Sequence, residues 1–148
     1  MQALLLVILI GLVSGASIGL QGPMANMISQ RLGVMESVII VHIGGALAGI
    51  LALLAFGKGT GKLSQWRELP WYLLAAGIFG LVVLSAYTYM IPRIGVTTAV
   101  LVTVTGQLAV SAVLDQYGFL GAEIRPLTLP RLLGIVVMFL GVWLTVKD

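Results

Sequence analysis

The chain has 148 residues, of which 59% are hydrophobic and only 9% are charged, with a formal net charge of +3. Soluble domains carry roughly 25% charged residues, so this chain cannot cover a water-facing surface, and its mean hydropathy of +1.12 indicates an integral membrane protein. So few charges give no sign of nucleic-acid binding. Because there is no cysteine and only one histidine, disulfides and thiolate or histidine-rich metal centres are excluded, and no cofactor is expected.

Five apolar segments are candidates to cross the hydrocarbon core as helices, which takes about 20 residues each. They are predicted at residues 2–22, 37–57, 71–91, 95–114 and 131–147 of a single all-α, polytopic membrane domain. The first resembles a secretion signal in its apolar run, but it lacks a positively charged start and is expected to remain. The last is short, so Arg131 and Lys147 are expected to snorkel toward the headgroups.

Glycines recur at helical spacing on several of these segments, a pattern that lets two helix backbones approach closely. The predicted helix-packing positions are Gly11, Gly15, Gly19, Gly45, Gly49, Gly134 and Gly141. Pro23 and Pro92 are expected to kink or end the first and third helices. Near the end of the third helix, Tyr87 and Tyr89 are predicted either to anchor the membrane interface or to stack on a substrate.

The fourth segment carries a polar stripe. Polar residues recur there at every fourth position: Thr103, Gln107, Ser111 and Asp115. This spacing places them along one helix face, while the other faces carry valine, leucine and alanine. Lipid does not satisfy amides or carboxylates, so the stripe must face protein, a water-filled cavity or a ligand. We therefore predict that Thr103, Gln107 and Ser111 bind polar groups of a substrate.

A second polar stripe lies on the first segment, where Ser17 and Gln21 are predicted either to face the same substrate or to make ordinary helix contacts. Three ionisable residues are candidates for ion coupling: Asp115 ends the fourth helix, Glu36 lies in the first turn of the second, and His42 shares a face with glycines. The alternative for Asp115 is a bond to a neighbouring backbone or arginine. The alternative for His42 is a structural hydrogen bond.

The basic residues predict the orientation of the chain, because lysine and arginine favour the cytoplasmic side. With five crossings, one side would hold Lys58, Lys62, Arg67, Arg125 and Arg131, and the other Arg31, Arg93 and Lys147. A chain so nearly balanced is predicted to insert both ways. Two copies in opposite orientations would form an inverted repeat, in which transporters place a substrate site at the midplane. The expected partners are therefore the lipid bilayer, a second copy of the chain and a small-molecule substrate.

The most distinctive residues of the chain form the block Gly106-Gln107-Leu108, Ser111, Asp115, Gly118-Phe119 and Gly121. They are accompanied by Gly19-Leu20-Gln21, Asn26, Leu32-Gly33, Gly44-Gly45, Arg131, Gly134 and Gly141-Val142. In these residues the chain resembles, over nearly its whole length, the YdcZ-like five-helix proteins of the drug/metabolite transporter superfamily. The resemblance implies a half-repeat of that superfamily in the inner membrane of a prokaryote, and export or exchange of small organic molecules. Members of the group occur as single genes, as pairs and as fused ten-helix proteins, which fits an antiparallel dimer.

The predicted function is a secondary-active transporter of a small organic metabolite or drug-like compound, working by alternating access as an antiparallel, dual-topology homodimer. The alternative is a non-transporting membrane subunit, either half of a heterodimer or an assembly factor. An enzyme is not predicted, because the single histidine and the five acids form no catalytic triad or carboxylate pair. The similarly sized four-helix multidrug exporters carry a carboxylate in the middle of helix one. Here that helix offers only Ser14, Ser17 and Gln21, so their mode of proton coupling is not carried over.

Overall fold

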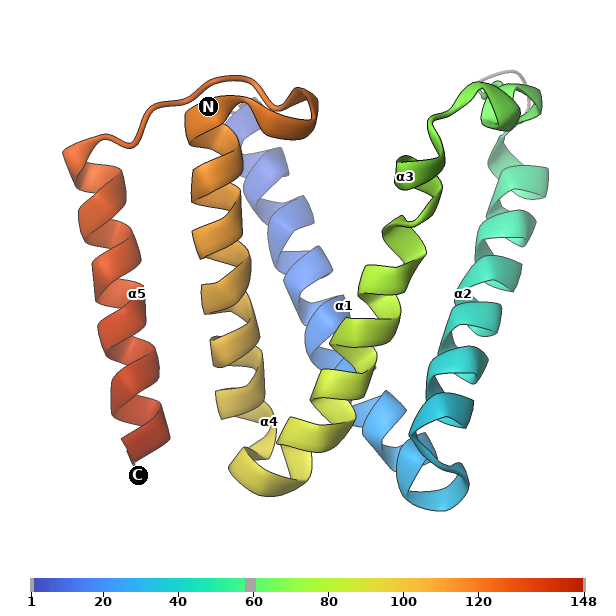
Figure 1. Cartoon of the computed structure of the whole chain (residues 1–148), viewed down its shortest axis with the longest axis horizontal. Coiled ribbons are helices and arrows are strands. Elements are labelled where there is room, and N and C mark those ends of the chain that lie inside the picture. The colour runs from blue at the N-terminus through green and yellow to red at the C-terminus, as the bar shows by residue number, and fades with distance from the viewer. Residues whose placement is uncertain (1, 58–60, 148) are drawn as a thin grey trace. The chain divides into compact units, whose positions relative to one another are not determined.

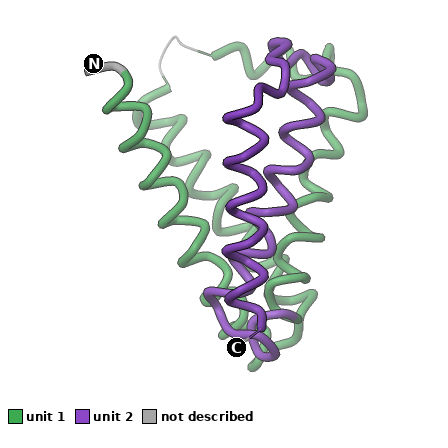
Figure 2. Tube along the Cα trace, turned by 90° about the vertical axis from the view of Figure 1, so that its left-hand side faces the viewer, with its two compact units in different colours: residues 1–89 green, residues 90–148 purple. Residues whose placement is uncertain are grey.

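The computed structural model describes residues 2–57 and 61–147, and this part of the chain contains helices and no β-strand, which confirms the all-α prediction. Figure 1 shows the helices in chain order. The chain divides into two compact units, residues 1–89 and residues 90–148, which are coloured separately in Figure 2. Each unit is described below by itself.

The first unit begins with two long helices, α1 (Gln2–Leu32) and α2 (Val34–Phe56). They are joined by Gly33 alone, whose φ of 113° suits glycine because a side chain would be strained there. The prediction that α1 ends near residue 22 is wrong, since the helix continues through Pro23 to Leu32. Proline removes one backbone donor, and a membrane helix tolerates that loss where neighbouring groups compensate for it.

A connection of short turns follows α2. It contains the 3-10 helix η1 (Leu63–Glu68) and the four-residue helix α3 (Trp71–Leu74), and it leads into the long helix α4 (Ala76–Tyr117). Pro92 lies inside α4 instead of ending it, and the helix breaks three residues later. The break is at Gly95, where φ is 75° and ψ is 168°, values that an L side chain rarely allows. The third and fourth predicted helices, 71–91 and 95–114, are thus joined by Gly95 alone.

Four helices of the described residues are long and apolar enough to cross a membrane: Leu4–Leu32, Val34–Phe56, Trp71–Tyr117 and Leu129–Lys147. The third has 47 residues. As a straight helix it would be about 70 Å long, more than twice the hydrocarbon thickness of about 30 Å. The break at Gly95 divides this stretch into two helical parts, each long enough for one crossing.

The second unit ends with α5 (Leu129–Lys147), which follows the short 3-10 helix η2 (Phe119–Gly121). Helix α5 begins two residues before the predicted start. Its 19 residues measure about 28 Å, close to a full crossing. The Nζ atom of Lys147 lies 5.2 Å from the centre of the Trp143 ring, so this cation is held at the helix end by an aromatic neighbour.

The small core of the first unit lies where α1, α2 and the first part of α4 meet. Ala25, Val38 and Leu84 form its apolar cluster. Tyr87 is only 2% exposed, and its ring packs on Gly22, where an added Cβ would lie 3.1 Å from Cδ1 of the ring. The prediction of an interface anchor is therefore wrong for Tyr87, because the missing side chain at residue 22 leaves room for the ring inside the unit.

Candidate functional site

The polar stripe of the fourth predicted helix lies in α4 after Gly95, where the backbone is helical and the four-residue spacing keeps the stripe on one face. The hydroxyl of Thr103 is half-buried and donates a hydrogen bond of 2.9 Å to the carbonyl of Ala99. Gln107 and Ser111 are exposed, and within the described residues neither makes a hydrogen bond. An amide and a hydroxyl are thus available on the exposed part of a largely apolar helix.

Asp115 ends the stripe in a different way, because its carboxylate forms an ion pair with the guanidinium of Arg131 at the start of α5. The backbone carbonyl of Asp115 also accepts a hydrogen bond of 2.8 Å from the backbone N–H of Arg125. Arg131 donates a further hydrogen bond of 3.2 Å to the carbonyl of Arg125. The segment between α4 and α5 is therefore bonded at Arg125 to both helices, to Asp115 of α4 and to Arg131 of α5.

An exposed ion pair lies on the same connection. The guanidinium of Arg125 donates hydrogen bonds of 3.1 and 2.7 Å to the carboxylate of Glu123. These hydrogen bonds, together with the negative charge of Glu123, raise the pKa of Arg125 above its ordinary value. Both side chains are mostly exposed, so water screens the interaction and the pair contributes little to folding.

In the first unit, Ser17 and Gln21 line a groove of about 470 Å³ between α1 and α2. Its walls also contain Met24 and the glycine pair Gly44-Gly45. The hydroxyl of Ser17 donates a hydrogen bond of 2.9 Å to the carbonyl of Val13 and keeps its lone pairs as acceptors. The side-chain amide of Gln21 makes no hydrogen bond within the described residues, so the groove offers both a donor and an acceptor.

His42 lines a second and smaller groove, of about 260 Å³, between α2 and the first part of α4. Its Nδ1 lies 2.7 Å from the backbone carbonyl oxygen of Val38. Its other nitrogen, Nε2, faces Gly80 of α4, where an added Cβ would lie 2.6 Å away. Glu36 lies in the first turn of α2, as predicted, and its carboxylate lies against the backbone of Gly33.

Polar atoms also occur inside the core of the first unit. The hydroxyl of Ser37 on α2 donates a hydrogen bond of 2.6 Å to the carbonyl of Ala25 on α1. Three further buried atoms have no partner among the described residues: Oδ1 of Asn26, Oγ of Ser85 and the hydroxyl oxygen of Tyr87. The sequence places Asn26 on the glycine face of the first helix and in the family resemblance, but it gives no sign that Ser37 joins two helices.

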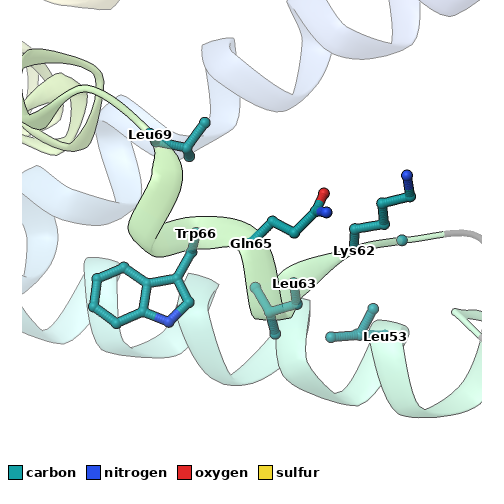
Figure 3. Close-up of a pocket in the computed structure, with 7 residues that line it drawn as sticks. Leu53, Lys62, Leu63, Gln65, Trp66 and Leu69 are labelled. Carbon is teal, nitrogen blue, oxygen red and sulfur yellow. The ribbon is translucent and has the colours of Figure 1, made fainter.

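A third groove, of about 420 Å³, lies at the end of α2 beside η1 (Figure 3). Leu53, Leu63 and Trp66 line its apolar side, while Lys62 and Gln65 point away from these residues in the figure. The guanidinium of Arg67 lies 5.5 Å from the centre of the Trp66 ring. Aromatic and basic side chains of this kind are typical of the membrane–water boundary.

The structure therefore brings the predicted residues together in two sets. Ser17 and Gln21 share a groove in the first unit, and Thr103, Gln107 and Ser111 share a helix face in the second. Each set belongs to its own compact unit. Among the described residues no group of three or more histidine, cysteine, aspartate or glutamate side chains is placed to hold a metal ion.

A family model matches residues 6–144 of the chain, and the family is described as "Putative inner membrane exporter, YdcZ". No curated protein and no solved structure matches the chain. The match covers nearly the whole length, including most of each long helix and the entire polar stripe. The membrane-crossing helices of the described residues agree with a multi-pass protein of the inner membrane. The chain therefore belongs to the YdcZ family of inner membrane exporters, of the drug/metabolite transporter type.

Proposed function

We propose that the protein is a secondary-active exporter of a small organic molecule and that it works by alternating access as an antiparallel homodimer. The observation that carries this proposal is the exposure of Gln107 and Ser111 on an apolar helix. Lipid cannot satisfy their amide and hydroxyl groups. A substrate path between two copies of the chain would provide the polar surroundings that one copy lacks.

The glycines support a partner for the same faces. At each predicted helix-packing glycine, an added Cβ would meet nothing within 4 Å in the described chain: Gly11, Gly15, Gly19, Gly45, Gly49, Gly134 and Gly141. Glycine in a membrane helix allows a second helix to approach its backbone closely. These open faces are therefore suited to receive helices of a second copy.

The distribution of charge supports the antiparallel arrangement. Basic residues number five on the side of the N-terminus and three on the opposite side, and one of the five, Lys58, lies outside the described residues. So small a difference gives the insertion machinery little preference for one orientation. Two oppositely inserted copies form an inverted repeat, the architecture in which alternating access places the substrate site near the midplane.

The chemistry of the two polar sets indicates what such a path would bind. Gln107, Ser111 and Thr103 offer one amide and two hydroxyl groups, and Ser17 and Gln21 in the α1–α2 groove offer another of each. None of these side chains is charged. The substrate would be held by hydrogen bonds to its polar groups, while apolar neighbours such as Met24 contact its hydrocarbon part.

The orientation is tested with single cysteines, because the chain has none of its own. Gln65 lies in η1, which follows α2, and Gln30 lies near the end of α1. In Gln65→Cys and Gln30→Cys variants, a membrane-impermeant maleimide is applied to intact cells or to inverted vesicles. We expect each cysteine to be labelled from both sides in comparable amounts. Labelling of each cysteine from one side only would remove the antiparallel dimer.

Transport is tested in proteoliposomes on a solid-supported membrane with amino acids, polyamines, sugars and organic cations such as ethidium. We expect Gln107→Ala to reduce the current at least tenfold while leaving chemical cross-linking of the dimer unchanged. Gln30→Ala, an exposed glutamine near the end of α1, is the matched control and should transport like the natural protein. An undiminished current in Gln107→Ala would remove the substrate role of the stripe.

The second candidate function is a non-transporting subunit, because the open glycine faces would equally accept a different chain. Purification separates the two. A homodimeric transporter remains folded and active when it is expressed alone, whereas half of a heterodimer is unstable or inactive without its partner.

A further inference from the structure

The groove of Figure 3 lies where a membrane crossing ends. Helix α2 has 23 residues and measures about 34 Å, slightly more than the hydrocarbon thickness of about 30 Å. It ends at Phe56, and the next candidate crossing begins at Trp71. The connection between them therefore lies among the headgroups. Because Leu53 of the last turn of α2 lines the same groove as η1, this α2–η1 groove reaches from the hydrocarbon edge to the headgroups.

The wall of the α2–η1 groove is apolar and open. Besides Leu53 it contains Leu63, Trp66 and Leu69, which are 69%, 49% and 49% exposed. The hollow of about 420 Å³ is within the size range of ligand sites, which are mostly apolar. Since the groove begins at the hydrocarbon edge, a lipid chain can lie in it and remain continuous with the bilayer.

The polar rim of the groove carries positive charge. The side chains of Lys62 and Gln65 have no partner among the described residues, and in Figure 3 both point away from the apolar wall. The guanidinium of Arg67 lies 5.5 Å from the centre of the Trp66 ring, which holds a second cation beside the groove. Glu68 is the one acid of the connection, and it forms no ion pair with a described residue.

The charge of the rim selects the kind of lipid. The phosphate of an anionic phospholipid has a negative charge that its own headgroup does not neutralise, and an unpaired lysine ammonium group offers it three donors. A zwitterionic headgroup would instead bring its own cation next to Lys62 and Arg67. Each basic residue near the membrane surface strengthens the attraction of anionic lipid about fivefold.

We propose that the α2–η1 groove binds one acyl chain of an anionic phospholipid, such as phosphatidylglycerol, and that Lys62 and Arg67 hold its phosphate. The amide of Gln65 donates a hydrogen bond to the headgroup. The bound lipid connects η1 to the end of α2. Lipid binding needs neither transport nor a second copy of the chain, so it goes beyond the proposed function and is tested separately from it.

Tryptophan fluorescence tests the site, because the chain has only three tryptophans. In a Trp71→Phe, Trp143→Phe variant, Trp66 is the only reporter. Vesicles of phosphatidylcholine receive increasing fractions of phosphatidylglycerol brominated on its acyl chains, and the reverse pair of lipids is measured in parallel at about 150 mM salt. We expect the quenching of Trp66 to show at least about fivefold preference for phosphatidylglycerol. Equal quenching by the two lipids would overturn the proposal.

Substitutions on the rim and the wall separate the two parts of the site. Lys62→Gln should lower the preference for phosphatidylglycerol about fivefold, whereas Lys62→Arg keeps the charge and should retain the preference. Leu63→Ser leaves both cations in place and should weaken the binding of both lipids. An unchanged preference in Lys62→Gln contradicts the phosphate contact, and unchanged binding in Leu63→Ser contradicts the acyl-chain seat.

Trp143 provides the matched control. A cation also lies near its ring, with Nζ of Lys147 at 5.2 Å, but Trp143 lines none of the three grooves described above. In a Trp66→Phe, Trp71→Phe variant, we expect a clearly smaller preference than at Trp66. The same preference at both tryptophans would mean general attraction to a basic surface and would overturn the proposal. Glycerol phosphate has no acyl chain and should leave the quenching of Trp66 unchanged, so displacement by it would assign the groove to a free anion instead.

Discussion

Asp115, in the last turn of α4, forms an ion pair with Arg131, sixteen residues further along the chain in the first turns of α5. The pair closes the connection between the two helices, because the carbonyl of Asp115 also holds the backbone of Arg125. The acid at the end of the polar stripe is thereby bound to an arginine, which was one of the two alternatives that the sequence left open.

Loss of this pair should lower the stability of the folded chain. The side chains are 39% and 27% exposed, so we expect Arg131→Gln and Asp115→Asn each to cost about 1 kcal/mol. The double variant should cost little more than either single variant, because the shared interaction is lost once. Equilibrium unfolding of all four proteins in a graded detergent mixture gives the coupling energy. Strictly additive losses would show that the two side chains do not interact.

The more exposed pair of Arg125 and Glu123 should behave differently from that pair. Since Glu123 raises the pKa of Arg125, the stability that this arginine contributes is present at every pH below its ordinary pKa. It is lost only as the pH rises through the raised value. Unfolding curves of Arg125→Gln and of the natural chain should therefore stay parallel from about pH 6 to about pH 9. Divergence within this window would mean that another group depends on Arg125.

Ser37 is expected to hold α2 against α1. Its buried hydroxyl donates a hydrogen bond of 2.6 Å to Ala25 of the other helix, and such bonds in membrane proteins contribute about 0.6–2 kcal/mol. Ser37→Ala should lower the free energy of unfolding by that amount. In Ser29→Ala the lost hydrogen bond joins two residues of α1, so the effect should be smaller. Equal losses in the two variants would argue against a bond between helices.

An added methyl group should have different effects at two glycines of α1, lowering chain stability at one and weakening the dimer at the other. At Gly22 an added Cβ would lie 3.1 Å from the ring of Tyr87, and such overpacking costs about 1–3 kcal/mol of chain stability. At Gly15 the methyl group would meet nothing within 4 Å, so Gly15→Ala should leave chain stability unchanged and weaken the dimer. Thermal unfolding reports the first effect and fluorescence energy transfer between labelled copies the second. An unaffected dimer in Gly15→Ala would exclude this face from the interface.

The all-helical, membrane-spanning class of the chain could be predicted from the sequence, because the apolar composition of a crossing helix depends on local residues alone. The ends of helices were harder to predict. Pro23 and Pro92 both lie inside helices that continue beyond them, since the cost of one missing donor depends on what packs around it. Gly95 ends a crossing instead, through a backbone conformation that no periodicity in the sequence reveals.

The candidate site was predictable only as far as one helix reaches. The spacing from Thr103 to Ser111 places these residues on one face, and this needs no knowledge of the fold. The approach of His42 to Gly80 and the bond of Ser37 to Ala25 depend instead on where separate segments meet. Neither Gly80 nor Ser37 differs in its local sequence from the many other small residues of the chain.

The joint at Gly95 has a consequence for how the protein enters the bilayer during synthesis. Only one non-helical residue separates two crossings, which leaves no hydrophilic loop that could be exposed to water between them. We therefore expect the two segments to enter the bilayer together as one hairpin. Arg93, two residues before the joint, lies at the turn of this hairpin, where it counts toward the small charge difference from which the orientation is predicted.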